Sequence, residues 1–113
     1  MSDDAESAVP EGAAVFPLIP EELGVHPLLL AVLHAVVFLD GSDEEVVHPD
    51  AADEALEYLA GYVQRLAGDD LRRAREDMAT LASFAHQEKW PKQMTRFLKD
   101  FLQTYGAEGE RGQ

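Results

Sequence analysis

Four histidines and a group of carboxylates are the side chains of this 113-residue sequence that could bind a metal ion. Glu45 and His48 form Glu-x-x-His, a spacing that supplies two ligands to di-iron sites in helical bundles. Such a site needs the pattern twice, on helix interiors, whereas here it occurs once, directly before Pro49. We therefore expect no metal ligand and no cofactor, and keep metal binding as an alternative.

Acidic residues crowd the segment between the first two predicted helices: Asp40, Asp43, Glu44, Glu45 and Asp50. Carboxylate oxygens of this kind suit a hard cation such as calcium. The order Asp-Gly-Ser-Asp-Glu-Glu lacks the alternation of ligands found in an EF-hand loop. We interpret the segment as a solvated loop beside a helix N-terminus, with weak cation binding as the alternative.

His34 is the one polar residue in the otherwise apolar run from Leu28 to Leu39. It could act as a ligand or proton carrier inside the protein, but a core or interface histidine bonded through one ring nitrogen is the simpler interpretation. His86 falls near the end of a predicted helix, where a positive charge interacts favourably with the helix dipole.

No pattern in the sequence specifies a reaction. The chain contains no cysteine, which excludes a thiol nucleophile, a disulfide, a cysteine-ligated zinc and an iron–sulfur cluster. It also lacks a Gly-x-Ser-x-Gly elbow and a glycine-rich phosphate loop. We expect a protein that is not an enzyme and has no catalytic residue.

The formal charge of −13 is unevenly distributed along the chain. Residues 1–57 contain fourteen of the 22 acids and no lysine or arginine, whereas residues 58–113 contain all nine bases. Long-range repulsion at this net charge disfavours direct binding to nucleic-acid phosphates or to an anionic membrane. The longest apolar run would be about 18 Å long as a helix, too short for a bilayer core of about 30 Å.

The first residues lack a basic segment followed by an apolar one, so they do not resemble a secretory signal. We expect a cytoplasmic protein.

Prolines and glycines divide the sequence into predicted helices. Pro27, Pro49 and Pro91 suit the first helical position, which places His26, His48 and Trp90 at the caps. The predicted helices span residues 27–40, 50–67, 70–88 and 91–105. Gly61, inside the second, is expected to allow another helix to approach closely. Arg73 and Asp77 are expected on the solvated outside of the third.

These elements predict an all-α fold, a compact bundle of about four helices. Residues 1–15 are small and acidic and read as a disordered tail, and residues 107–113 as a second disordered tail. Residues 16–106 form a single helical domain in this interpretation.

Eleven of the twelve residues from Leu28 to Leu39 are apolar, so a helix there is apolar on every side and must be covered on every side. Three further helices can hardly surround it, which predicts a second copy of the chain as the cover. The candidate interface residues of this helix are Leu29, Val32, Val36 and Val37. Phe16, Leu18 and Ile19 lie between prolines and pack either on the chain's own core or on a partner.

Lys92, Arg96 and Lys99 step by four and three along the last predicted helix and form a row of bases. Because the first half of the chain is acidic and contains no base, these three residues are candidates for charge pairing within one chain, between copies or with an acidic partner. The plain alternative is a solvated helix face.

The sequence favours a non-enzymatic protein–protein interaction module that self-associates as a homodimer. The first alternative is a small helical sensor or enzyme that binds a metal or ligand through His34, His48 or the acidic loop. The second is an acidic inhibitor or decoy that occupies the basic surface of a nucleic-acid-binding protein.

Overall fold

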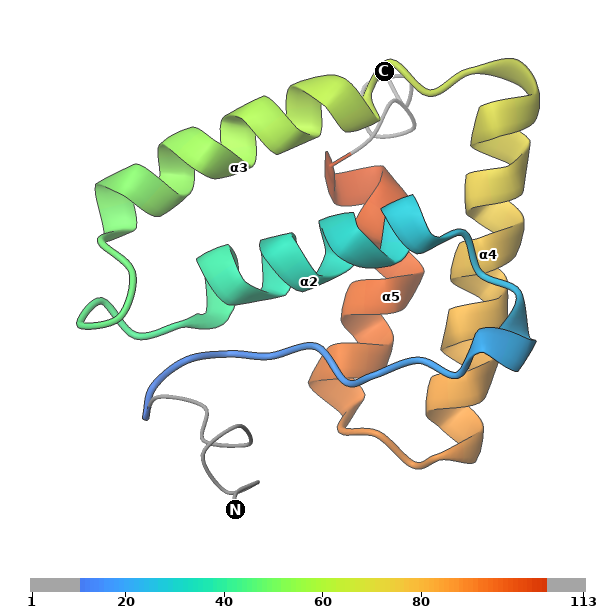
Figure 1. Cartoon of the computed structure of the whole chain (residues 1–113), viewed down its shortest axis with the longest axis horizontal. Helices are drawn as coiled ribbons and strands as arrows, with labels where there is room; N and C mark the ends of the chain where they lie inside the picture. The colour runs from blue at the N-terminus through green and yellow to red at the C-terminus, as the bar shows by residue number, and fades with distance from the viewer. Residues whose placement is uncertain (1–10, 106–113) are drawn as a thin grey trace.

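The computed structural model describes residues 11–105 and shows four α-helices in this range, preceded by one short 3₁₀ turn (Figure 1). The elements are η1 (Glu21–Leu23), α2 (Pro27–Gly41), α3 (Pro49–Val63), α4 (Gly68–Gln87) and α5 (Lys92–Tyr105). No strand occurs within the described residues, so the predicted all-α fold of about four helices is confirmed. Most of the two predicted tails, residues 1–10 and 107–113, lies outside this range.

The helices form two hairpins. α2 packs along α3, α4 packs along α5, and α3 also contacts α5. Figure 1 shows α2 and α3 side by side and antiparallel, with the α4–α5 hairpin running across them. None of the described helices is both long and apolar enough to cross a membrane.

Histidine and proline together determine where α2 and α3 begin. The Nδ1 atoms of His26 and His48 accept hydrogen bonds of 3.1 Å from the backbone N–H groups two residues later. Pro27 and Pro49 follow at the first helical position, where a missing N–H costs nothing. The predicted cap positions of both histidines are therefore confirmed.

The boundary between α3 and α4 differs from the prediction. α3 ends at Val63, four residues early, because hydrogen bonds from Arg65 N to Tyr62 O and from Leu66 N to Val63 O tighten the chain into a turn. α4 then begins at Gly68, which adopts a positive φ of 56°. At the other junction, α5 begins one residue after Pro91.

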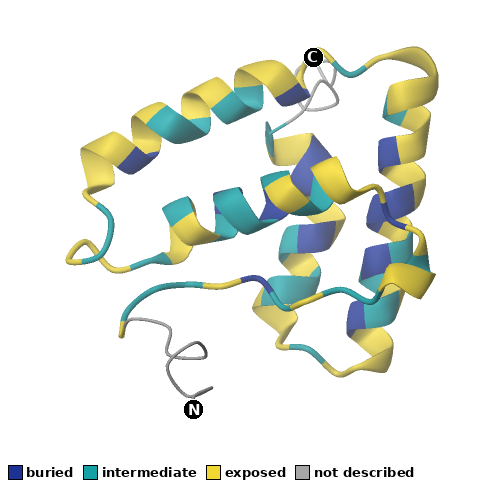
Figure 2. Cartoon of the chain, viewed as in Figure 1, coloured by how far each residue is buried: buried dark blue, intermediate teal, exposed yellow. Residues whose placement is uncertain are grey.

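The core lies where the two hairpins meet and also includes the segment before α2 (Figure 2). Its fully buried large side chains are Phe16, Phe101, Leu33, Leu81, Leu98 and Val36. Phe16 comes from the segment of residues 11–26, which we call the strap. Its ring lies edge-on to His34 at 5.2 Å and to Trp90 at 5.7 Å, so the strap links α2 to the α4–α5 turn.

The strap forms hydrogen bonds from Gly12 onward, within residues 11–15 that the sequence assigned to a disordered tail. The Asp43 N–H donates to the Gly12 carbonyl at 2.8 Å, and the Ala14 N–H donates to Ser42 Oγ at 2.9 Å. Gly12 has a φ of 89°, and a Cβ there would lie 2.7 Å from Asp43 Oδ2. The loop after α2 therefore supplies hydrogen-bond partners for the backbone of the strap, which sequence composition does not reveal.

Gly61 does not serve the close helix approach that the sequence suggested. It is exposed in the middle of α3, and a Cβ at this position would meet no atom within 4 Å. The core-facing side of α3 carries Ala52, Leu56 and Val63 instead. Within one chain, this glycine only weakens the helix.

Gly61→Ala should therefore raise the free energy of unfolding by about 1 kcal/mol, because alanine has the higher helix propensity. Urea denaturation followed by circular dichroism measures the change. Gly12→Ala is the matched control and should lower stability, because that site combines a positive φ with contact to Asp43. A loss of stability in Gly61→Ala would contradict the open environment of this position.

Candidate interaction surfaces

The residues proposed as metal ligands have other roles or stand apart. His26 and His48 use Nδ1 to cap helices, and half-buried His34 packs against Phe16. Among residues 11–105, no group of three or more histidine, aspartate or glutamate side chains is arranged to hold a metal ion. Glu45 and His48 are both exposed.

The acidic loop is a solvated connection in the structure. Asp40, Asp43, Glu44 and Glu45 are exposed, and the backbone of Asp43 holds the strap. Tyr105, the last residue of α5, is half-buried, and its burial, with a smaller effect of the Asp40 carboxylate, raises the pKa of the phenol above its ordinary value. The charge of Asp40, at the start of the acidic loop, therefore acts on the phenol of Tyr105 at the end of α5.

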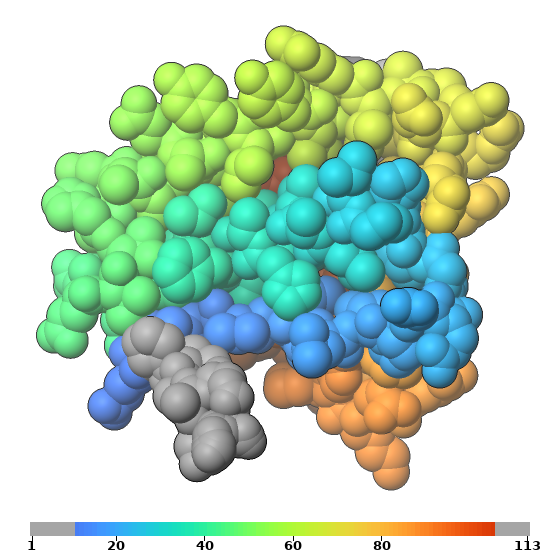
Figure 3. Space-filling model, in the orientation of Figure 1, coloured from blue at the N-terminus to red at the C-terminus, as the bar shows by residue number. Residues whose placement is uncertain are grey.

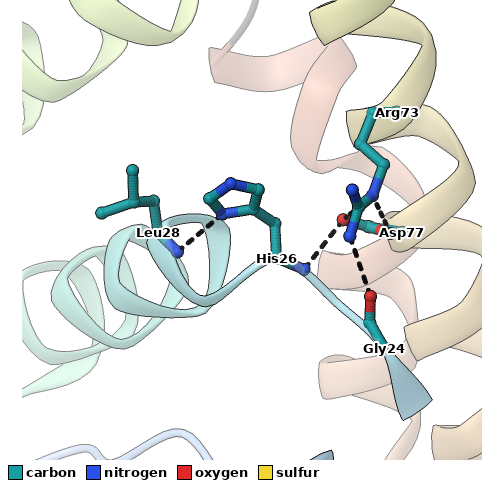
Figure 4. A network of polar contacts seen from close by, with 5 residues as sticks. All are labelled: Gly24, His26, Leu28, Arg73 and Asp77. Carbon is teal, nitrogen blue, oxygen red and sulfur yellow. Dashed lines mark hydrogen bonds and ion pairs between the residues drawn. The ribbon is translucent and has the colours of Figure 1, made fainter.

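A buried carboxylate joins the strap to α4 (Figure 4). Asp77 is 6% exposed, and its Oδ2 accepts a hydrogen bond of 3.0 Å from the His26 backbone N–H. Arg73 Nε lies 3.1 Å from both carboxylate oxygens of Asp77, and its Nη2 donates to the Gly24 carbonyl at 2.9 Å. Carboxylate and guanidinium together hold the chain on both sides of Val25.

The prediction of a solvated pair on the outside of this helix is thus wrong for Asp77, which is buried, whereas Arg73 is exposed. The spacing of four residues is correct, but the strap covers Asp77 and supplies an N–H donor to it. A carboxylate can be buried when a cation and hydrogen-bond donors satisfy it. The sequence spacing carries no signal for a partner 51 residues away.

The predicted interface residues differ in their exposure. Phe16 and Val36 are each 1% exposed and lie in the core of the chain itself, so they present no surface to a partner in this structure. Ile19 and Val37 are half-buried and pack against the same core. Leu18 is 89% exposed on the strap.

Leu29 and Val32 line an apolar pocket that opens at the surface between α2, α3 and α4. Its cavity volume is about 370 Å³. Tyr62 and Val63 of α3, and Leu66 of the turn that follows, contribute one of its sides. The sequence did not reveal this pocket, because it depends on how the two hairpins meet.

The outward side of α2 is an apolar stripe, which we call the α2 face: Leu28, Ala31, Ala35 and Phe38. Leu28 is 70% exposed, Phe38 is 39% exposed, Ala31 is exposed and Ala35 is half-buried. Leu28 also lines the pocket, so the two apolar surfaces are continuous. In the space-filling view, α2 and the strap form much of the face toward the viewer (Figure 3).

Lys92, Arg96 and Lys99 are all exposed on α5, as a row on the side of the helix opposite its core residues Leu98 and Phe101. Within the described residues, none of these three bases forms an ion pair. Their charges therefore have no ion-pair partner within residues 11–105.

Comparison with protein-family models, with curated proteins and with solved structures finds no significant match for this chain.

Replacing Asp77 tests whether the buried network holds the strap. Asp77→Ala should lower the free energy of unfolding by about 3 kcal/mol, because it leaves the His26 N–H and Arg73 without their acceptor. Asp77→Asn should cost less, because the amide oxygen can still accept from His26. Urea denaturation measures both variants.

Asp69→Ala is the matched control, because Asp69 forms an ion pair with Arg72 in which both side chains are mostly exposed. Such a pair is worth less than about 1 kcal/mol. Similar losses for Asp69→Ala and Asp77→Ala would show that the strap is not anchored by Asp77.

Proposed function

We propose that the protein is a non-enzymatic interaction module that self-associates as a homodimer through the α2 face. The observation that carries this proposal is the exposed apolar stripe of α2, which no element of residues 11–105 covers. A continuous exposed apolar surface of this kind is typical of a protein contact site. The adjoining pocket, with Leu29 and Val32, extends the same surface.

The spacing of the α2 face favours a second copy as the partner. Leu28, Ala31, Ala35 and Phe38 are separated by three, four and three residues, a pattern that is symmetric about residue 33. Two antiparallel copies of α2 would therefore place Leu28 opposite Phe38 and Ala31 opposite Ala35. In a two-fold interface each residue pair occurs twice in this reciprocal way. The small alanines in the centre would let the two helices approach closely.

Electrostatics permits this contact despite the high net charge. α2 carries no charged side chain between Pro27 and Leu39, so an antiparallel pair of α2 helices brings no like charges together at its centre. The repulsion between two acidic molecules acts over a longer range and is screened by salt. Association through the α2 face should therefore become stronger, or stay unchanged, as salt is added.

The alternative functions have less support from the described residues. Metal or ligand binding through His34 or His48 lacks a cluster of converging ligands within residues 11–105. A decoy role would use the exposed acids of the α2–α3 region, and no specific geometry favours it. A cytoplasmic location stays a prediction from the sequence.

Ala31→Glu tests the proposed dimer. The side chain is exposed in the single chain, so the variant should fold normally, but a dimer would bury an unpaired carboxylate at its centre. We expect the dissociation constant to rise by more than about tenfold, which corresponds to about 1.4 kcal/mol. Sedimentation equilibrium at several protein concentrations measures this constant.

Ala79→Glu provides the matched control, because Ala79 is an exposed alanine on α4 and the substitution adds the same charge. It should leave the dimer almost unchanged. A wild-type protein that is monomeric at all concentrations, or equal effects of the two substitutions, would contradict self-association through α2.

A further inference from the structure

Two exposed rows of opposite charge lie on α3 and α5. The acidic row on α3 consists of Asp50, Asp53, Glu54 and Glu57, and the basic row on α5 consists of Lys92, Arg96 and Lys99. Every side chain of both rows is exposed. Among the described residues, none of them forms an ion pair, so residues 11–105 do not neutralise either row.

The two rows match in length and in spacing. Asp50, Glu54 and Glu57 are separated by four and three residues, and so are Lys92, Arg96 and Lys99. Each row therefore extends about 10 Å along its helix, at a rise of 1.5 Å per residue. Each also lies on the side of its helix opposite the core residues, which are Ala52 and Val63 in α3 and Leu98 and Phe101 in α5. Either row can thus face a second helix along its whole length.

Local helix energetics does not explain the position of Lys92. Lys92 is the first residue of α5, where the positive end of the helix dipole disfavours a cation. Lys89, which precedes the row, has a positive φ of 57° at the end of α4, a conformation that favours glycine. A residue whose charge or backbone conformation is unfavourable for its own helix commonly serves a contact outside that helix.

The basic row also borders a hollow in the surface. Lys89, Trp90, Lys92, Arg96 and Lys99 line this hollow, whose volume is about 590 Å³, and Asp100 is the one acid among its lining residues. The lysines and the arginine thus border one shallow hollow of the surface. A concave site with this charge fits a convex acidic partner such as a helix face.

We propose that the acidic row on α3 of one copy docks on the basic row on α5 of another copy. The inference rests on the proposed self-association, since the partner is again a second copy, but it uses neither the α2 face nor the pocket. Charge complementarity between equally spaced rows selects this partner: residues 1–57 carry no lysine or arginine, so the α3 row has no bases near it in sequence.

This contact should be weak, sensitive to salt and able to extend beyond two copies. Exposed ion pairs contribute little individually and are screened by added salt. The contact joins two different surfaces, so each copy that docks through α3 still offers its own α5 row to the next copy. Its response to salt should therefore be opposite to that of the contact through α2.

Charge reversal with rescue tests the pairing. One variant combines Lys92→Glu, Arg96→Glu and Lys99→Glu, and the other combines Asp53→Lys, Glu54→Lys and Glu57→Lys. All six positions are exposed, so both variants should fold, which far-UV circular dichroism checks. Sedimentation velocity at about 0.05 M and about 0.5 M salt follows the assembly, because charge screening differs strongly between these concentrations.

We expect the wild type to form a salt-sensitive assembly larger than the dimer, and each variant alone to lose it by more than about tenfold in affinity. An equimolar mixture should regain it, because each reversed row then meets an opposite one. The α3 variant has a smaller net charge than the wild type, so general repulsion alone would predict stronger association. Stronger association of that variant, or no recovery in the mixture, would overturn the proposal.

A control variant makes the same charge change as the α3 variant at exposed positions away from both rows: Glu21→Lys, Glu22→Lys and Glu76→Lys. This control should keep the assembly. The reversed variants should also retain the dimer formed through α2. Salt-insensitive dimers unaffected by charge reversal would overturn the row pairing and leave the proposed function intact. A wild type that is monomeric at both salt concentrations would overturn both.

Chemical cross-linking of the wild type tests the pairing without any substitution. A carbodiimide joins a carboxylate to an amine that it contacts directly, and mixing isotope-labelled with unlabelled protein identifies links between copies. We expect links from Glu54 or Glu57 to Lys92 or Lys99 between differently labelled chains. Links confined to one chain would count against docking between copies.

Discussion

The arrangement of this protein depends on the buried hydrogen-bond network of Asp77. The strap crosses from the loop after α2 to α4, and Asp77 and Arg73 bind its backbone at His26 and Gly24. His26 also caps α2, so one residue links the anchor on α4 to the start of the most apolar helix. α2 packs Leu33 and Val36 inward and leaves Leu28 and Phe38 outside.

Much of the fold can be predicted from local rules. Proline at the first helical position, preceded by histidine, correctly located the starts of α2 and α3, because both effects act within a few residues. The α3–α4 boundary was less predictable, since Arg65 and Leu66 form a turn that helix propensity does not exclude. The burial of Asp77 required a donor from the strap, and no periodicity within α4 reports that contact.

The sequence predicted that α2 would expose apolar surface, but not which of its residues would form that surface. An apolar run as long as Leu28 to Leu39 indicates more apolar surface than one small domain can cover, and the structure leaves Leu28 and Phe38 exposed. Which residues stay outside could not be read from a helix that is apolar on all sides, because it lacks a polar face to orient it. Val36 was therefore predicted at an interface and lies in the core.

The apolar α2 face and the charged rows of α3 and α5 are the basis of the two contacts that we propose with a second copy of the chain. Native mass spectrometry of the untagged protein, purified without chelator and measured at two concentrations, tests this claim most directly. The apolar contact predicts a dimer that gains population with concentration and carries no additional mass. A monomer at both concentrations that carries a stoichiometric metal or small molecule would contradict it and would favour a ligand-binding role.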